Sequence, residues 1–343
     1  PGEDEMLTHG KGIIGHVIAS GERVIAPDVR LNPHYFAGRA ETLSEIAVPI
    51  LRGERAIGAL NLESDRLGAY DASHLEVLQF FADAAAIALE KAMLHRQLLQ
   101  KELLDKQLQI ASEVQRHLLP MEKPRIPGYD IAGVCIPTDE IGGDYYDYLP
   151  LPHGNLGIAV ADVSGHGIAA ALAMTAFRSL LRTHTQGVRD PANIARLINR
   201  LLPEFAGDRQ FITMVYGELS LKRDEICFAS CGHPPPLLLH RNGRYKTLGF
   251  NGPALGIFPQ AAYENENMLL TQNDILVMYT DGVVDIENPE GQAFGVRRLM
   301  TVIHQNRQLS AEAMIQRIIS ETRIFSGYLT YLDDFTLVIV KRG

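Results

Sequence analysis

Cysteine, long apolar runs and excess positive charge are scarce or absent in this chain of 343 residues. Its three cysteines, Cys135, Cys227 and Cys231, are an odd number without Cys-x-x-Cys spacing, which favours reduced thiols and a cytoplasmic location over a disulfide framework. No apolar run approaches the ~20 residues that a transmembrane helix needs, so we expect no membrane segment. The net charge of -9 argues against general nucleic-acid binding, which requires a basic face.

Internal repeats and low-complexity tracts are also absent. With 46% hydrophobic and 21% charged residues, the composition is that of an ordinary globular protein. At about 150 residues per domain, the length predicts two domains. We expect a small first domain over residues 1–70, a long helix over residues 71–118 and a larger second domain over residues 119–343.

The first segment, over residues 11–63, has the pattern of a small α/β unit. A short amphipathic helix is predicted to begin at Gly12 and to end at Gly21. The next apolar run predicts a strand that ends at Pro27. Two further apolar runs flank a turn at Gly53, which is the pattern that a β-hairpin requires.

A long helix is predicted between Asp71, a good N-cap, and Pro120, because no proline or glycine lies between them. Apolar residues form a heptad-like seam that charged residues interrupt, which is typical of helices that pair in a dimer. Packing of the helix on its own domain also explains the first part of the seam, over residues 75–90. We expect a homodimer, with Val114 and Leu118 pressing one helix face onto the second domain. The seam consists of Leu75, Leu78, Ala82, Ala85, Leu89, Ala92, Leu99, Leu103 and Ile110.

The second domain has a mixed pattern of strands and helices. Strands with helices clustered between them predict sheets that helices cover. The expected strands span residues 130–136, 145–150, 156–162, 211–219, 225–230, 236–240, 275–280 and 335–340. The expected helices span residues 167–185, 191–202, 295–305 and 310–324.

Four aspartates, each at the edge of a strand-like apolar run, are the most informative feature of this domain. They are Asp144 in Ile-Gly-Gly-Asp-Tyr-Tyr-Asp, Asp162 in Ala-Asp-Val-Ser-Gly-His-Gly, Asp281 in Tyr-Thr-Asp-Gly-Val and Asp333 in Asp-Asp-Phe-Thr. Strand ends can meet in one place, and clusters of oxygen ligands suit hard divalent cations. Taken singly, each aspartate is more typical of a turn, a cap or a solvated loop than of a metal site. The pattern alone therefore leaves both interpretations open.

Electrostatics sets a condition on the metal-site interpretation. Two carboxylates ~4 Å apart repel by about 4 kcal/mol at an effective dielectric constant near 20, so four ionised carboxylates need cations to stay together. Two divalent cations would balance the charge, and they can activate a water for attack on a phosphate ester. Gly142, Gly143 and Gly282 would let the backbone approach a metal or a phosphate closely.

Residues 111–340 carry a series of motifs in a fixed order. The series resembles the bacterial stage-II-sporulation-E/RsbU-type branch of the PP2C (PPM) serine/threonine phosphatases. The resemblance implies an α-β-β-α sandwich, two Mn²⁺ or Mg²⁺ ions and phosphoprotein substrates. The motifs are Ala-Ser-Glu-Val-Gln-Arg-His-Leu-Leu-Pro from Ala111, Glu-Ile-Gly-Gly-Asp-Tyr-Tyr-Asp from Glu140, Ala-Asp-Val-Ser-Gly-His-Gly from Ala161, Phe-Ile-Thr-Met-Val-Tyr-Gly from Phe211, Gly-His-Pro-Pro-Pro-Leu from Gly232, Gly-Pro-Ala-Leu-Gly from Gly252, Tyr-Thr-Asp-Gly-Val from Tyr279 and Asp-Asp-Phe-Thr from Asp333.

The same resemblance assigns roles residue by residue. Asp162 would contact both metals, together with the backbone carbonyl of Val163. Asp144 would serve the second metal, and both Asp144 and Asp162 would count as catalytic. Asp281 and Asp333 would complete the shell of the first metal, with Asp334 as the alternative if the register shifts by one. His166 is a candidate acid for the leaving group, or only a histidine beside a helix start, and no equivalent of the phosphate-binding arginine of eukaryotic relatives is found.

Residues 10–93 resemble the C-terminal part of a GAF domain, a small-molecule sensor module. The matching stretches are Gly-Lys-Gly-Ile-Ile-Gly-His-Val from Gly10, Val-Ile-Ala-Pro-Asp-Val from Val24, Ser-Glu-Ile-Ala-Val-Pro-Ile from Ser44 and Ile-Gly-Ala-Leu-Asn-Leu from Ile57. The first helix and strands of that family are missing, so this is a partial GAF domain whose ligand is unknown. No cysteine precedes Cys135, which excludes a thioether-linked bilin.

Three hypotheses follow for the function. The first is a metal-dependent protein serine/threonine phosphatase in signal transduction, regulated by the GAF domain through the helix; the resemblance implies a STAS-type anti-sigma-factor antagonist as its substrate, and hence sigma-factor regulation. The second is a GAF-based ligand-binding module with a weakly active or inactive phosphatase scaffold. The third is a diguanylate cyclase, suggested by Gly-Gly-Asp at Asp144, but the residues that follow are Tyr-Tyr rather than Glu-Phe.

Overall fold

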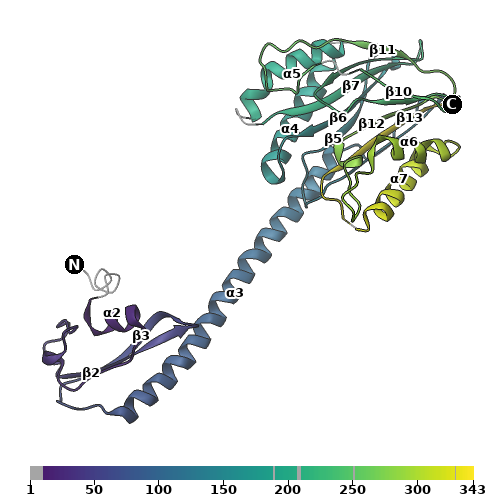
Figure 1. The fold of residues 1–343 in the computed structure, drawn as a ribbon. Coiled ribbons are helices and arrows are strands. Elements are labelled where there is room, and N and C mark those ends of the chain that lie inside the picture. The colour runs from purple at the N-terminus through teal and green to yellow at the C-terminus, as the bar shows by residue number, and fades with distance from the viewer. Residues whose placement is uncertain (1–10, 188–189, 207–209, 250–251, 329) are drawn as a thin grey trace. The chain divides into compact units, whose positions relative to one another are not determined.

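The computed structural model describes residues 11–187, 190–206, 210–249, 252–328 and 330–343. The chain divides into two compact units, Pro1–Asp105 and Lys106–Gly343, which are described separately (Figure 1). Among the helices of the described residues, none combines the length and the apolar character needed to cross a membrane.

The first unit is a small antiparallel sheet with a helix on each face. The predicted short helix is confirmed as α2 (Gly12–Ser20), and it ends at Gly21 in a left-handed conformation with φ 71°. One face of the sheet packs against Ile13 and Val17 of α2, and the other packs against the long helix. The strands pair in the order β1-β2-β3, and they are β1 (Val24–Ala26), β2 (Ser44–Arg52) and β3 (Arg55–Ser64), with a short 3-10 turn η1 (Val29–Leu31).

The long helix, α3 (Ala72–Leu118), begins where its sequence predicts. The side chain of Asp71 caps it by accepting hydrogen bonds from the backbone N–H groups of Ser73 (2.9 Å) and His74 (3.1 Å). Leu78 and Ala82 of the predicted seam are buried against the sheet of the first unit, so packing on the helix's own domain accounts for that part of the seam. The later seam residues Leu99, Leu103 and Ile110 are exposed by 52%, 60% and 63%, and their pairing in a dimer stays a prediction.

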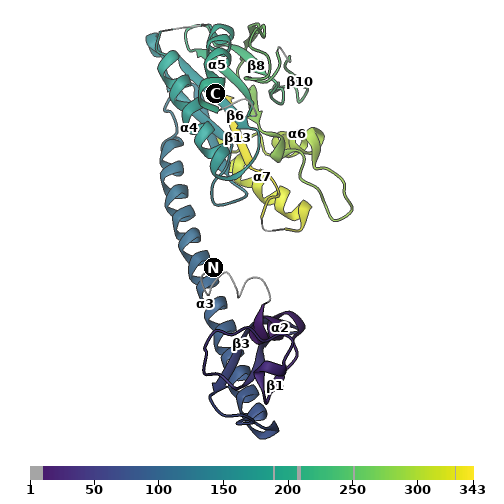
Figure 2. The ribbon, with the colours of Figure 1, turned by 90° about the vertical axis from the view of Figure 1, so that its left-hand side faces the viewer.

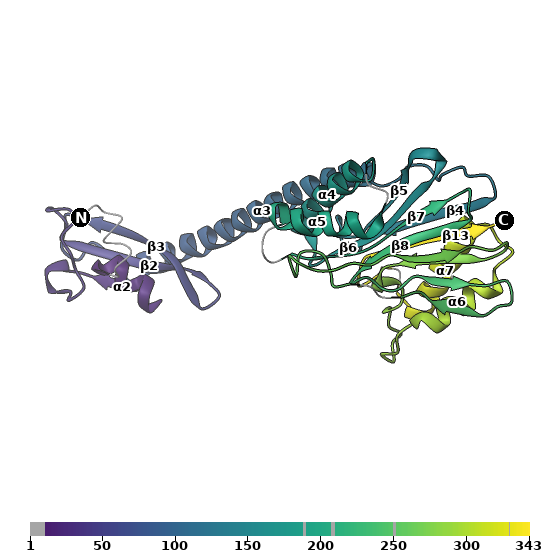
Figure 3. The same cartoon turned by 90° about the horizontal axis from the view of Figure 1, so that it is seen from above.

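The second unit confirms the predicted α-β-β-α sandwich. Two five-stranded antiparallel sheets, ordered β10-β9-β12-β13-β4 and β11-β8-β7-β6-β5, stack face to face. Helices α4 and α5 cover one sheet, and α6 and α7 cover the other (Figure 2 and Figure 3). The helices are α4 (Gly167–His184), α5 (Pro191–Ala206), α6 (Gly295–Gln305) and α7 (Ala311–Ser326), with 3-10 turns η2 (Pro152–Gly154) and η3 (Asp281–Val283). The strands are β4 (Tyr129–Ile136), β5 (Tyr145–Pro150), β6 (Leu156–Val163), β7 (Ile212–Ser220), β8 (Glu225–Cys231), β9 (Leu237–Leu239), β10 (Tyr245–Thr247), β11 (Glu266–Leu269), β12 (Ile275–Tyr279) and β13 (Phe335–Arg342).

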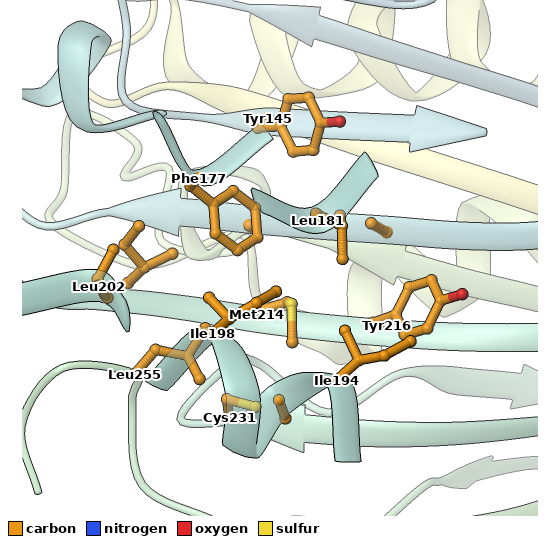
Figure 4. Close-up of a cluster of buried hydrophobic side chains, with 14 of the residues drawn as sticks. Tyr145, Phe177, Leu181, Ile194, Ile198, Leu202, Met214, Tyr216, Cys231 and Leu255 are labelled. Atoms are coloured by element: carbon orange, nitrogen blue, oxygen red, sulfur yellow. The ribbon is translucent and has the colours of Figure 1, made fainter. Parts of the chain in front are cut away.

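The core has three layers because successive strand residues point to opposite faces of a sheet. In β6, Ile158 and Val160 face the opposing sheet, whereas Ala159 and Ala161 lie under α4 and α5. Figure 4 shows the layer beneath these helices, where the rings of Tyr145 and Phe177 meet edge to face with centroids 5.7 Å apart. The small alanines of β6 leave room for these large side chains.

Two strands, β10 and β11, have no counterpart among the predicted elements. Both lie at an outer edge of a sheet. All three residues of β10 are exposed, and β11 has no fully buried residue, so neither strand shows the apolar alternation that marks a strand in a sequence. The local sequence therefore predicts these edge strands far less clearly than it predicts the central strands.

A buried ion pair joins α4 to the strand that follows Asp144. The carboxylate of Asp147 is fully buried and accepts two hydrogen bonds from Arg182, at 2.7 and 2.8 Å. The hydroxyl of Tyr145 and the backbone N–H of Tyr148 also donate to it. This network fixes the first residues of β5 relative to α4.

We expect Asp147→Ala to lower the free energy of unfolding by about 2–3 kcal/mol, because Arg182 and Tyr145 would lose a shared buried partner. The estimate is below the cost of breaking a fully buried pair, since the side chain of Arg182 is 42% exposed. Urea unfolding followed by circular dichroism measures the change. The control is Glu312→Ala, which removes the exposed ion pair with Lys123 and should lower the free energy of unfolding far less. Equal effects of the two substitutions would contradict the assignment.

Candidate active site

The aspartates predicted from the sequence lie at the ends of strands from both sheets. Asp162 belongs to β6, and Asp144 directly precedes β5 in the same sheet. Asp281 follows β12, and Asp333 lies just before β13 in the other sheet. Burial, followed by the negative charges of Asp281, Asp333 and Asp334, raises the pKa of Asp162 to about 7. The structure therefore brings these carboxylates together in one region.

Asp144 is the most deeply buried member, with 3% of its surface exposed. Its carboxylate accepts a hydrogen bond of 2.8 Å from the hydroxyl of Thr280, the residue before Asp281. Burial, followed by the charge of Asp162, raises its pKa well above the ordinary value for an aspartate. The two sheets are thus linked through Thr280 at the place where the acids meet.

Asp281 and Asp333 lie at the solvent-facing mouth of the site. The carboxylate of Asp281 accepts the backbone N–H of Gly282 at 3.0 Å, and that of Asp333 accepts the N–H of Asp334 at 2.8 Å. Partial burial and the charge of Asp281 raise the pKa of Asp333. Each of these side chains is therefore oriented by its own loop.

The carboxylate of Asp334 is engaged by a backbone loop. It accepts hydrogen bonds from the N–H groups of Thr138 (2.8 Å), Gly143 (2.8 Å) and Asp144 (3.3 Å). Asp334 therefore closes residues 138–144 into a fixed loop that carries Asp144. Sequence reasoning named Asp334 only as an alternative metal ligand, because contacts to backbone N–H groups across nearly 200 residues leave no local signal.

Three glycines make this close packing possible. A Cβ atom on Gly142 would collide with the carboxylate of Asp334, and one on Gly282 would collide with the carbonyl of Asp334. A Cβ on Gly143 would lie 2.8 Å from the backbone carbonyl oxygen of Val163. The backbone carbonyl of Val163 thus lies directly against the Gly-Gly loop, and its role as a metal ligand stays a prediction.

The carboxylate oxygens of this site are the kind of ligand that hard cations prefer, although they do not surround a single point. Among the described residues, no three His, Cys, Asp or Glu side chains are close enough to enclose one ion. The neighbours that shift the pKa values of Asp144 and Asp162 include no lysine or arginine, so the protein itself does not compensate these charges. Oxygen donors without protein counter-charges fit Mg²⁺ or Mn²⁺ better than Zn²⁺. Because these pKa values are raised, protons compete with cations for the same carboxylate oxygens.

Two histidines near the site differ sharply. His166 is exposed at the start of α4, and its imidazole takes part in no hydrogen bond among the described residues. His233 is 1% exposed, burial lowers its pKa to about 3, and its Nδ1 lies 2.8 Å from the hydroxyl of Thr213. Thr213 pairs with Asp162 across β6 and β7, so neutral His233 supports the strand beside Asp162.

The end of α3 reaches this site through a residue that sequence reasoning missed. The side-chain amide of Gln115 donates to the carbonyl of Gly142 at 2.7 Å and accepts the N–H of Gly142 at 3.1 Å. The expected contact of Val114 is wrong, because Val114 points outward and is 59% exposed. Leu118 does pack on the core, and its carbonyl accepts a hydrogen bond from Arg178 of α4. The one signal for Gln115 was its place in the motif that begins at Ala111, one helical turn before Leu118.

Comparison with known families gives two matches. The model for stage II sporulation protein E (SpoIIE) matches residues 152–343. The chain belongs to the SpoIIE family. A GAF-domain model matches residues 2–90. The SpoIIE match covers three of the four predicted aspartates, and Asp144 lies just before its start.

Curated relatives and solved structures agree with the SpoIIE assignment. Protein IcfG of Synechocystis is 28% identical over 69% of this chain, and phosphoserine phosphatase RsbU of Bacillus subtilis is 28% identical over 69% of it. The chain spans 42% of the length of IcfG and 70% of RsbU. The SiaA-PP2C domain of Pseudomonas aeruginosa superimposes with a TM-score of 0.62 at 22% identity, over 71% of this chain and 98% of that domain. The chain therefore carries a SpoIIE-type serine/threonine phosphatase domain with a PP2C-like fold, together with a GAF domain.

We expect Asp334→Ala to release the loop over residues 138–144, because three backbone N–H groups lose their acceptor. Hydrogen–deuterium exchange of the Gly143 and Asp144 amides should then become at least about tenfold faster in the metal-free protein, which corresponds to the loss of about 1.4 kcal/mol of protection. The matched control is Asp139→Ala, an exposed aspartate in the same loop. Unchanged exchange in Asp334→Ala would show that the loop does not depend on this carboxylate.

Proposed function

We propose that this protein is a metal-dependent phosphatase that removes phosphate from phosphoserine or phosphothreonine of a partner protein. The observation that carries the proposal is the convergence of carboxylates from both sheets around Asp162, without a protein cation to balance them. Membership of the SpoIIE family supports the same chemistry. The relatives RsbU and RsbP of Bacillus subtilis are both named phosphoserine phosphatases.

We assign the metal-holding role to the residues that the sequence predicted. Asp144, Asp162, Asp281 and Asp333, with the carbonyl of Val163, would hold two Mn²⁺ or Mg²⁺ ions. When bound, such ions polarise a phosphoryl oxygen and activate a water molecule. Thr280 holds the carboxylate of Asp144, and Asp334 holds the backbone around it, so these two residues position the acid.

Two further roles concern the substrate. The described residues that shift the pKa of Asp162 include no arginine, so phosphate binding falls to the cations and to backbone N–H groups of the glycine-rich loops. His166, exposed at the start of α4, is the candidate acid for the leaving serine or threonine oxygen. By family resemblance, the substrate is a STAS-type anti-sigma-factor antagonist in the cytoplasm.

We also propose that the GAF segment regulates the phosphatase through α3, in response to a small molecule that is not yet known. The domains would be a partial GAF sensor over residues 1–70, the helix over residues 71–118 and the phosphatase over residues 119–343. Two hydrogen bonds between Gln115 and Gly142 connect the end of α3 directly to the loop that carries Asp144. The exposed apolar residues Leu99, Leu103 and Ile110 support pairing of α3 in a homodimer.

The chemistry is tested with p-nitrophenyl phosphate and a phosphothreonine peptide. Chelation should abolish turnover, and Mn²⁺ or Mg²⁺ should restore it whereas Zn²⁺ should not. Asp162→Asn should reduce the restored turnover by at least about 100-fold, the upper end of what loss of a supporting group costs a metal site. The control, Asp139→Asn, changes an exposed aspartate outside the cluster. Full activity after metal removal, verified by elemental analysis, would overturn the metal dependence, whereas absence of turnover with every cation would favour the GAF-based binding module.

Regulation through the helix is tested by breaking its continuity. Insertion of two glycines after Gln100 should change basal turnover and weaken dimerisation, because each glycine costs about 1 kcal/mol of helix stability and together they shift the register. Two inserted alanines serve as the matched control for flexibility, since they shift the register without breaking the helix. Activity and sedimentation unchanged in both insertions would show that α3 is a passive connection.

A further inference from the structure

A narrow slot adjoins the carboxylate site. It lies between residues 285–287 on one side and residues 326, 328 and 330–332 on the other, and it has a volume of about 50 Å³. That volume accommodates the end of one side chain rather than a whole small molecule. Gly282 and Asp333 line the slot and also belong to the carboxylate site. Any group in the slot therefore lies next to the place where a phosphate ester would react.

The walls of the slot are held by specific contacts. The ring of Tyr331 stacks on Phe335 with centroids 4.7 Å apart, and its hydroxyl lies 3.0 Å from that of Thr322. The hydroxyl of Ser326 accepts the backbone N–H of Tyr328 at 3.2 Å. The segment between α7 and β13 is thus anchored from beneath.

This anchoring leaves two large side chains facing solvent beside the slot. Leu332 is 86% exposed and Tyr328 is 58% exposed, and neither contributes to the cores of the unit. Exposed apolar side chains next to a reaction site are typical of contacts with a macromolecular partner.

The charged residues that line the slot are all acidic, although the guanidinium of Arg323 lies 5.9 Å from the ring centroid of Tyr331 on its wall. Asp285 and Glu287 are exposed on its wall, and no lysine or arginine occurs among the described residues that line it. A partner with a basic side chain at this position would therefore gain a complementary contact, whereas an acidic one would be repelled. The slot combines an apolar recess with an acidic rim.

We propose that this slot selects the substrate. An aliphatic side chain near the phosphorylated serine or threonine of a partner protein enters it against Leu332 and Tyr328, and Asp285 with Glu287 favours lysine or arginine beside that side chain. The inference rests on the proposed phosphatase function and adds the residue class that the substrate carries beside its phosphate.

The test uses phosphothreonine peptides that differ at one position. Leucine or serine is placed in turn at each of the positions flanking the phosphothreonine, and turnover is measured with Mn²⁺. Leucine at one position should raise kcat/KM about tenfold over serine, and Leu332→Ser should remove that preference while p-nitrophenyl phosphate turnover stays within about twofold of the wild type. The matched control is Leu269→Ser on β11, an exposed leucine in the other sheet.

A second set of peptides carries arginine or glutamate beside the leucine. The wild type should prefer arginine, and the double substitution Asp285→Asn with Glu287→Gln should reduce that preference several-fold. Hydrolysis of all peptides at similar rates would overturn this inference alone, whereas absence of any phosphate-ester turnover would overturn the proposed function with it. Loss of self-association in Leu332→Ser, measured by sedimentation, would identify a second copy as the occupant and would also overturn the inference.

Discussion

Mutual repulsion among carboxylates is the constraint on which the second unit depends. Asp144, Asp162, Asp281 and Asp333 come from both sheets, and pairs of ionised carboxylates ~4 Å apart would repel by about 4 kcal/mol at an effective dielectric constant near 20. Burial first, and then the charges of the neighbouring carboxylates, raise the pKa values of Asp144 and Asp162. A flexible chain would separate such charges. The stacked sheets hold them because each acid is fixed by a strand end whose neighbours are buried in a packed core.

The loops convert that scaffold into a defined site. Asp334 gathers three backbone N–H groups of the loop before β5, and Thr280 holds the carboxylate of Asp144 from the opposing sheet. Gly142 also forms hydrogen bonds with Gln115. The loop is therefore held by two groups, the carboxylate of Asp334 and the side-chain amide at the end of α3. A small displacement of Gln115 would act on the backbone two residues from Asp144. The same contacts that hold the site in place therefore also connect it to the end of α3.

The sequence predicts most of this fold because its central strands are apolar and its helices are bounded by glycine, proline or capping residues. It does not predict β10 and β11, whose exposed edge positions carry no periodic signal. The grouping of the aspartates follows from motif resemblance. The role of Asp334 in holding the loop cannot be predicted in this way, because its hydrogen-bond partners are backbone N–H groups far away in the chain. The expectation for Val114 failed because helical spacing alone cannot tell which face meets the core. Tertiary hydrogen bonds, rather than local patterns, decide these details.

In the proposed function, catalysis and substrate choice depend on different parts of this unit. The acids sit at strand ends, where a changed side chain would disturb charge balance and two sheets at once. The slot is built from the connection between α7 and β13, and its outward residues Leu332 and Tyr328 support no core. Substitution there would leave the positions of Asp162 and Asp144 intact, since Tyr331 and Ser326 anchor the segment independently. A fold arranged in this way can alter which partner it accepts without rebuilding its reactive centre, as expected when function resides in loops on a rigid scaffold.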